Sequence, residues 1–471
     1  MDAQVGKFID IFATAVQLAQ AQQPPMERGN ELLTTLSDHL GSPAAEVPLV
    51  VETFPAHRYA DLDIALSGLA ETDPAARLVG IGGGDQRHHS ALNDLLQQAR
   101  MYPQFPLAQP DYANEAIGPE DQRQVVSLGI YLLEYDGVRL AVLQRAANDR
   151  YGRQEASVEV LAAQPAAAAA FLTELRNRMQ GRSVIKGQVV TLTINPYGAS
   201  GSGVTFHHRP TLVADDVILP EGLLAKVSDH TVRADSQQEL LRSLGQHLKR
   251  GILLYGPPGT GKTHTVRYLL SQTPGTTAIL LSGNSLAFVA EAARMARALQ
   301  PSIVVLEDCD LIAEDRSFSN GPQPLLFEVL DAMDGLDDDA DVAFVLTTNR
   351  ADLLERALAQ RPGRVDLAVE IPKPAAAQRE ALLALYGREM GFSPAALAQV
   401  AAATNGTTAS FARELVRRSV IVASRRGEAP ADSHLVAAAE DMMADSQALT
   451  RSLLGSGPEV TNEPDPGQMW S

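Results

Sequence analysis

Residues 256–263 read Gly-Pro-Pro-Gly-Thr-Gly-Lys-Thr, which fits the phosphate-binding pattern G-x-x-x-x-G-K-[ST] at every fixed position. The apolar run 251–255 before it predicts a buried strand of a parallel sheet. Residues 264–270 after it predict the first turns of a helix, with apolar side chains on one face. Strand, glycine-rich loop and helix in this order are the context in which the motif binds a nucleotide. We therefore expect ATP or GTP to bind here.

The residue types of this loop explain its chemistry. Glycines allow backbone N–H groups to turn toward phosphate oxygens at the positive end of the following helix. Lys262 can reach the β and γ oxygens, and Thr263 can bring its hydroxyl to Mg²⁺. A turn that binds nothing would need neither the lysine nor the hydroxyl. The residues expected to contact the nucleotide are Gly256, Pro257, Pro258, Gly259, Thr260, Gly261, Lys262, Thr263 and His264.

Two further apolar strands end in polar residues. Residues 303–306 predict a buried strand followed by Glu307 and Asp308, where an acid can hold Mg²⁺ or direct a water. Residues 342–346 predict another, followed by Thr347, Thr348 and Asn349. An amide at that place can position the attacking water or contact the γ-phosphate. Two solvated acids after a core strand remain the simpler alternative.

A pair of arginines follows these strands. Arg361 and Arg364 flank a Pro-Gly turn beyond the predicted sheet. Core packing explains such a pair poorly, whereas donation to a phosphate explains it well. Solvated surface arginines remain the alternative.

Together these four motifs resemble the AAA branch of the AAA+ ATPases over about residues 215–425. The resemblance implies an α/β fold, in which a parallel sheet with flanking helices carries a small helical lid. It also implies a ring of identical subunits, usually a hexamer, that hydrolyses ATP with Mg²⁺. Asn349 would be the first sensor, and Arg361 and Arg364 would reach into the neighbouring subunit. Such arginine fingers contribute about 10³- to 10⁵-fold in rate in related phosphoryl transfer.

The chain departs from the family pattern at several positions. Its acids are in the order Glu-Asp instead of Asp-Glu, and Asp310 fixes the register, so that Glu307 becomes the metal-side acid and Asp308 the base. One extra residue before Arg361 weakens its assignment as an arginine finger more than it weakens that of Arg364. Ala409-Ser410 stand where Gly-Ala are usual near the nucleotide base, so the identity of the second sensor is left open. We expect Phe411, Leu415 and Val416 in the core of the lid.

The aromatic pore loop of threading unfoldases is not evident in this sequence. Phe288-Val289-Ala290 is the nearest candidate, and we expect it on a helix face with Ala292 and Met295. Threading of a substrate through a central pore is therefore an open hypothesis.

Composition narrows the function classes. The net charge of -18 argues against general nucleic-acid binding, and no apolar run approaches the ~20 residues that span a membrane. The single cysteine, Cys309, excludes an internal disulfide and fits a reducing cytoplasm. Adjacent histidines at 88–89 and 207–208 would point to opposite faces of a strand, which is poor geometry for one metal.

The predicted organisation has five parts. We expect an N-terminal α+β domain at 1–182 that recognises a protein partner, and a small β element or linker at 183–215. The large ATPase subdomain follows at 216–372, the helical lid at 373–445 and a disordered acidic tail at 446–471. Within the first part, strands at 125–135 and 138–145 joined by Asp136-Gly137 predict a β-hairpin.

Three functions remain in consideration. The first is a cytoplasmic ring ATPase that remodels or disassembles an unknown protein client. The second is a nucleotide-gated scaffold that hydrolyses slowly, which the Asp at 308 and the missing pore aromatic favour. The third, a small-molecule kinase, is disfavoured because it needs neither Asn349 nor the paired arginines.

Overall fold

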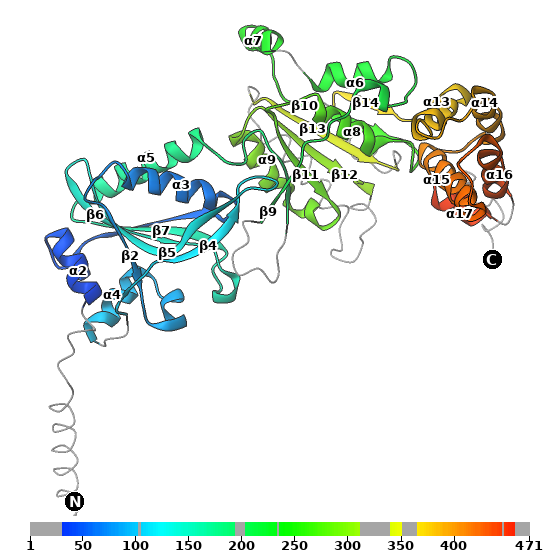
Figure 1. Cartoon of the computed structure of the whole chain (residues 1–471). Coiled ribbons are helices and arrows are strands. Elements are labelled where there is room, and N and C mark those ends of the chain that lie inside the picture. The colour runs from blue at the N-terminus through cyan, green and yellow to red at the C-terminus, as the bar shows by residue number, and fades with distance from the viewer. Residues whose placement is uncertain are drawn as a thin grey trace, which may run out of the picture. The chain divides into compact units, whose positions relative to one another are not determined.

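A computed structural model describes residues 31–101, 105–193, 203–232, 235–310, 340–350, 365–444 and 447–456 (Figure 1). The chain divides into two compact units. The N-terminal unit comprises Met1–Val184 with Thr193–Thr205, and the C-terminal unit comprises Ile185–Leu192 with Phe206–Ser471.

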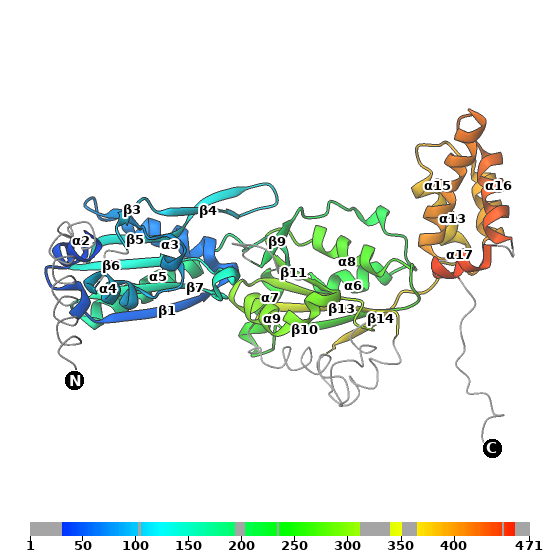
Figure 2. The same ribbon diagram turned by 90° about the horizontal axis from the view of Figure 1, so that it is seen from below.

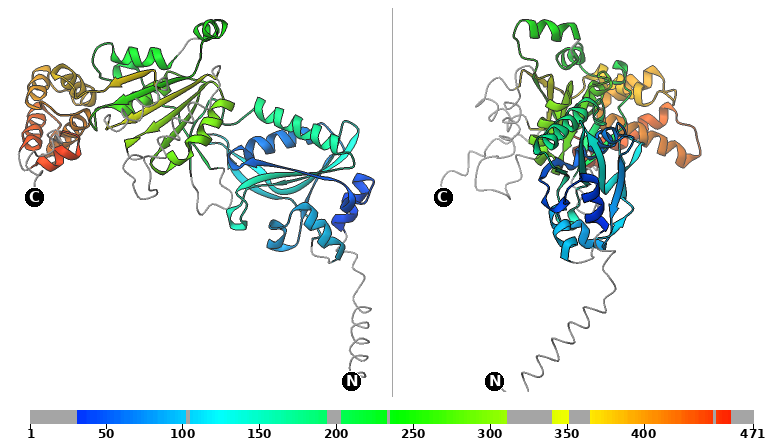
Figure 3. Two further views of the ribbon diagram at one scale, coloured as in Figure 1. Left: turned by 180° about the vertical axis from the view of Figure 1, so that it is seen from behind. Right: turned by 90° about the vertical axis from the view of Figure 1, so that its left-hand side faces the viewer.

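The N-terminal unit is an α+β structure built on an antiparallel sheet with strand order β1-β7-β6-β5-β2-β3, in which β4 also pairs with β5. Helices α3 and α5 lie along one face of the sheet, and α2 and α4 lie on the other (Figures 1 and 3). The strands are β1 (Leu49–Pro55), β2 (Arg77–Ile81), β3 (Leu107–Ala108), β4 (Asp111–Ala116), β5 (Gln122–Tyr135), β6 (Val138–Arg145) and β7 (Glu155–Ala162). The helices are α2 (Glu31–Leu40), α3 (Tyr59–Ala70), α4 (Leu92–Met101) and α5 (Pro165–Gly181).

The predicted hairpin is confirmed. Tyr135 pairs with Val138, so Asp136 and Gly137 form a two-residue turn. Their φ angles of 50° and 78° are both positive, as a type I′ turn requires. The central strand β5 is buried on both faces, because Tyr131 and Leu133 pack toward α3 and α5 while Ile130 and Leu132 pack toward α2 and α4.

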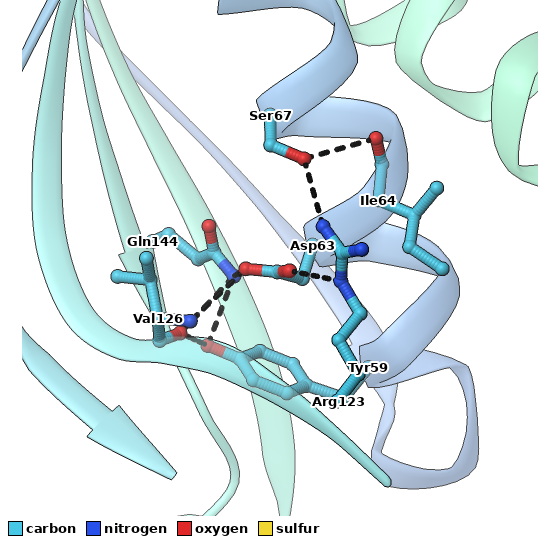
Figure 4. A network of polar contacts seen from close by, with 7 residues as sticks. All are labelled: Tyr59, Asp63, Ile64, Ser67, Arg123, Val126 and Gln144. Carbon is cyan, nitrogen blue, oxygen red and sulfur yellow. Dashed lines mark hydrogen bonds and ion pairs between the residues drawn. The ribbon is translucent and has the colours of Figure 1, made fainter. Parts of the chain in front are cut away.

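A polar network lies inside this apolar unit, between α3 and β5 (Figure 4). The Asp63 carboxylate accepts hydrogen bonds from the Val126 backbone N–H at 3.0 Å, Gln144 Nε2 at 3.3 Å and Arg123 Nε at 3.2 Å. The Tyr59 hydroxyl donates to the carbonyl of Val126. Because Asp63 is only 3% exposed, these bonds offset the cost of removing its charge from water.

The C-terminal unit contains the second sheet, with strand order β14-β10-β13-β12-β11-β8-β9 (Figure 2). The pairings from β14 to β8 are all parallel. The strands are β8 (Val189–Leu192), β9 (Val204–His207), β10 (Arg250–Tyr255), β11 (Thr277–Ser282), β12 (Ser302–Glu307), β13 (Val342–Thr348) and β14 (Leu367–Glu370). The helices around it are α6 (Leu223–Thr231), α7 (Asp235–Ser243), α8 (Lys262–Ser271) and α9 (Val289–Ala298).

This sheet brings the predicted motifs to one edge. Tyr255 at the end of β10 pairs with Thr348 of β13, and Glu307 at the end of β12 pairs with Ser282 of β11. Since neighbouring parallel strands end together, the residues that follow them share the carboxyl edge, where α/β sheets place ligands. The expected α/β class with a parallel sheet and flanking helices is confirmed. The stretch 183–215 does contain strands, and the first of them, β8, joins this sheet beside β11.

A helical subdomain follows the sheet. Its helices are α13 (Ala376–Tyr386), α14 (Pro394–Ala403), α15 (Ala409–Arg426), α16 (Asp432–Met443) and α17 (Ala448–Leu453). As expected, Phe411, Leu415 and Val416 lie in its core, together with Leu435. The prediction of disorder from residue 446 onward is wrong for residues 447–456, because they form α17 and a segment that packs on α15. Residues 457–471 lie outside the described residues.

Candidate active site

The phosphate loop, residues 256–263, connects β10 to α8. Gly256 has a φ angle of 144°, and a side chain there would collide with the carbonyl oxygen of Ile371. Gly261 caps the N-terminus of α8 with a left-handed φ of 112°. Within the loop, Thr260 Oγ1 donates to the Pro257 carbonyl at 2.9 Å. The loop thus ends at the positive end of a ten-residue helix, the arrangement that binds anions.

Lys262 is folded into this loop. Its ammonium donates to the carbonyls of Gly256 at 2.8 Å and Pro257 at 2.9 Å. Burial lowers the pKa of Lys262 to about 8, and the charges of Asp308 and Asp310 oppose that shift. A nearby anion such as a phosphate would favour the charged form of the lysine.

Thr263 and Glu307 form the pair expected to hold a metal. Burial raises the pKa of Glu307, and the nearby Thr263 hydroxyl and the charge of Arg267 work in the opposite direction. A hydroxyl and a carboxylate side by side are oxygen donors of the kind that Mg²⁺ takes.

Asp308 stands where the chain leaves β12. Its φ angle of 52° lies in the left-handed region, where Asp and Asn are tolerated better than longer side chains. Its backbone N–H donates to Thr347 Oγ1 at 3.1 Å, and the next N–H, of Cys309, donates to the Thr347 carbonyl at 2.9 Å. These bonds to the end of β13 hold the turn. The left-handed φ gives a local reason for an Asp at the second acidic position, where the family usually has Glu.

Asn349 lies across from this acid at the end of β13. Its Nδ2 is 3.5 Å from Asp308 Oδ1 and 3.3 Å from Asp310 Oδ2. Asp310 also accepts from Thr348 Oγ1 and from the Asn349 backbone N–H, both at 3.1 Å. Our sequence analysis used Asp310 only to fix the register of the acids. The only signal in the sequence was an acid two residues after Asp308, and its burial follows from how the chain turns after β12.

Other expected site residues are placed differently. His264 Nε2 lies 2.9 Å from the carbonyl of Asp216, so this ring is bonded to the segment before α6. Arg361 and Arg364 fall in residues 351–364, outside the described residues. Val289 begins α9 and is buried with Ala292 and Met295, as expected for a helix face, whereas Phe288 ends the 3-10 turn before the helix and is half-buried, and Ala290 is exposed.

The helical subdomain contacts the phosphate loop directly. The Ser410 N–H donates to the Gly259 carbonyl at 3.0 Å, which places the residue expected near the second sensor against the loop. Gly455 lies against Pro258 so closely that a side chain on it would collide with the Pro258 carbonyl oxygen. Thr408 Oγ1 donates to the Leu454 carbonyl at 2.7 Å and so links this segment to the start of α15.

The described ranges also bear on metal sites and membrane spans. No group of three or more His, Cys, Asp or Glu side chains there is arranged to hold a metal ion. Among the helices that the structure describes, none combines the length and the hydropathy that crossing a membrane requires.

Comparisons with known proteins match the same part of the chain. A family model described as the ATPase family associated with various cellular activities (AAA) matches residues 252–373. Proteasome-activating nucleotidase 2 of Haloferax volcanii is 32% identical over 195 residues, 38% of this chain and 47% of that protein. The 26S proteasome regulatory subunit 8 homolog of Schizosaccharomyces pombe is 37% identical over 170 residues, 33% of this chain and 42% of that protein.

The similarity to a third relative extends over more of this chain. ATP-dependent zinc metalloprotease FtsH 1 of Symbiobacterium thermophilum is 31% identical over 268 residues, 52% of this chain and 45% of that protein. The chain therefore spans less than half the length of each of these three relatives.

Proposed function

We propose that this chain, whose residues 252–373 form an ATPase domain of the AAA family, hydrolyses ATP in a ring of identical subunits and remodels a protein partner. The observation that carries the proposal is the grouping of Lys262, Asp308 and Asn349 at one edge of the parallel sheet. The names of the similar proteins refer to proteasomes and to a metalloprotease, which supports a protein as the partner.

The residues divide the chemistry between them. Backbone N–H groups of the phosphate loop and Lys262 bind the β- and γ-phosphates, and thereby orient the γ-phosphorus toward Asp308. Thr263 and Glu307 would hold Mg²⁺, which would neutralise charge on the phosphate oxygens. Asp308 accepts a proton from the attacking water as general base. Arg364, supplied by the adjacent subunit, stabilises the charge that develops on the transferred phosphoryl group.

The N-terminal unit is the proposed site of partner recognition. It has its own two-sided core, and neither the phosphate loop nor Glu307 and Asp308 belong to it. Such a unit can fold independently of the ATP site and present a surface to a client.

A nucleotide-gated scaffold is the second candidate. The burial of Val289 at the start of α9 favours it, because an apolar residue that grips a substrate in a pore must be exposed. The short Asp308 side chain favours it as well, since it must approach the water more closely than a Glu would. A scaffold would assemble on ATP and turn it over slowly.

The test measures phosphate release at increasing protein concentration, with wild type and Arg364→Ala, alongside sedimentation in saturating Mg-ATP. The proposal expects turnover per subunit to rise as rings assemble, and Arg364→Ala to lose about 10³- to 10⁵-fold while still binding ATP. A protein that remains monomeric and hydrolyses ATP at full speed, or an Arg364→Ala variant with wild-type turnover, would overturn it.

A second experiment separates remodelling from scaffolding. The Asp308→Asn variant, which binds ATP without activating water, is used to capture the client. A remodelling ATPase should hold its client in this state and fail to release it. A scaffold should bind and release the same client as the wild type does.

A further inference from the structure

Asp310 is the least explained acid of the site. It is 8% exposed, whereas Asp308, two residues before it, is exposed. Its carboxylate accepts hydrogen bonds from the end of β13 and the residue after it: from Thr348 Oγ1, the Asn349 backbone N–H and Asn349 Nδ2. Its carboxylate therefore fixes both the backbone and the side chain of Asn349.

The two acids together determine how the Asn349 amide is turned. An amide NH₂ only donates hydrogen bonds, and the amide oxygen only accepts them. Two carboxylate oxygens lie near the same amide atom, at 3.3 Å for Asp310 and a longer 3.5 Å for Asp308. An amide oxygen in that place would be repelled by both carboxylates. The NH₂ group thus faces the acids, and Oδ1 is left as the available end of the side chain.

We propose that Asp310 is a positioning residue that holds Asn349 with its Oδ1 available to accept a hydrogen bond from the attacking water. This inference rests on the proposed function. The water donates one hydrogen to Asn349 Oδ1 and the other to the second carboxylate oxygen of Asp308. Its proton passes to Asp308, its oxygen bonds to the γ-phosphorus, and the bond from that phosphorus to the bridging oxygen breaks, which releases ADP.

This arrangement differs from one in which Asn349 donates to the γ-phosphate. Both hydrogens of its NH₂ group already meet carboxylates, so donation to phosphate would require it to break one of these bonds. An acceptor orients water and contributes to the chemical step more than to ATP binding. The expected signature is therefore a loss in kcat with little change in KM.

The decisive variant is Asp310→Asn. An Asn there keeps one oxygen for Thr348 and the Asn349 backbone, but it turns an NH₂ group toward the Asn349 NH₂ and forces that amide to flip. We expect kcat to fall by about 10²-fold, with the KM for ATP nearly unchanged, since removing one oriented group typically costs this much. Asp229→Asn, the same change on the exposed face of α6, is the matched control and should leave both constants unchanged.

The double variant Asp310→Asn/Asn349→Asp tests the direction of the bond. Its two side chains exchange roles, so residue 349 again accepts and the charge of the site is restored, but the carboxylate at 349 now lies beside that of Asp308 and the recovery is therefore partial. We expect kcat to recover by roughly 10-fold over Asp310→Asn, equivalent to about 1.4 kcal/mol. If Asn349 instead donates to phosphate, a carboxylate there repels ATP and the double variant is no better than the single one, which overturns the inference.

Two further outcomes are distinguishable. If the wild-type chain hydrolyses ATP and Asp310→Asn does so equally well, the inference falls and the proposed function stands. If the wild type releases no phosphate, both fall. Should Asp310→Asn fail to fold, Asp310→Glu keeps the carboxylate but moves it by one methylene, and the same loss of kcat without a change in KM is required.

Discussion

Two acids of this protein, Asp63 and Asp308, meet their surroundings in opposite ways. Asp63 lies between α3 and β5 of the N-terminal unit, where it is 3% exposed and accepts from three donors (Figure 4). The parallel sheet of the C-terminal unit carries Glu307, Asp308 and Asn349 at or just beyond its strand ends, with Asp308 exposed. Buried polar groups that are hydrogen-bonded within the protein stabilise its fold, whereas exposed polar groups can bind a ligand. This contrast predicts that the two sets respond to mutation in different observables.

The largest effect is expected at the strand ends. Asp308→Asn removes the general base, so turnover should fall by about 10²- to 10⁴-fold. The free energy of unfolding should hardly change, because Asn also tolerates the left-handed φ of 52° at this position. Steady-state phosphate release and urea denaturation measure the two quantities. A large loss of stability with normal turnover would contradict the prediction that Asp308 serves catalysis and not the fold.

The second effect is expected inside the N-terminal unit. Asp63→Ala leaves the buried Val126 N–H without its acceptor, at about 2 kcal/mol, and removes the bonds from Gln144 and Arg123, at about 1 kcal/mol each, so the unfolding free energy should fall by roughly 4 kcal/mol. Hydrogen exchange of peptides from α3 and β5 reports this loss locally. ATP turnover should stay at the wild-type value, and a parallel loss of turnover would show that the two units are coupled.

The third effect depends on pH. Burial raises the pKa of Glu115 from 4.5 to about 7, so the folded state keeps a proton that the unfolded chain has released. Stability should therefore fall as pH rises through this window, by up to about 3 kcal/mol in total. Denaturation curves at pH 4 to 8 measure the free energy of unfolding, which should not decrease through this range in Glu115→Gln. An equal decrease in the wild type and the variant would show that Glu115 is charged in the folded state.

The smallest effect is expected on the surface. Arg150 lies 3.5 Å from Asp85, and both side chains are about 70% exposed. Solvent screens such a pair, so Arg150→Ala should change stability by less than about 1 kcal/mol, including its contact with the Tyr151 ring. Thermal unfolding measures it. A loss as large as that of Asp63→Ala would remove the distinction between enclosed and exposed charge.

Local patterns predicted much of both sheets. The apolar run before the phosphate loop became β10, and Asp136-Gly137 gave the hairpin of β5 and β6, because a strand period and a two-residue turn are visible in adjacent residues. The sequence analysis did not identify β1 or β7, which pair along seven residues that lie 100 to 112 positions apart. Pairing at that separation depends on the tertiary fold and leaves no local pattern.

The site was predictable to a similar extent. Residue types and spacing pointed to Lys262, Glu307, Asp308 and Asn349, which the structure gathers at one edge. The role of Asp310 depends on which side chain turns inward after a strand ends, and that follows from the left-handed backbone at Asp308. Gly455 and Pro258 are in contact although they lie about two hundred positions apart, so no sequence motif predicts this contact.

The pairing of β8 with β11 decides where this chain can be cut for separate study. A fragment that starts at residue 216 would lack β8, and the backbone N–H and C=O groups of β11 on that side would be open to pairing with other molecules. Exposed edges of this kind promote aggregation. A fragment that starts at residue 185 retains Ala278, Ile279 and Leu280 in their native pairs and should remain dispersed at concentrations at which the shorter one precipitates.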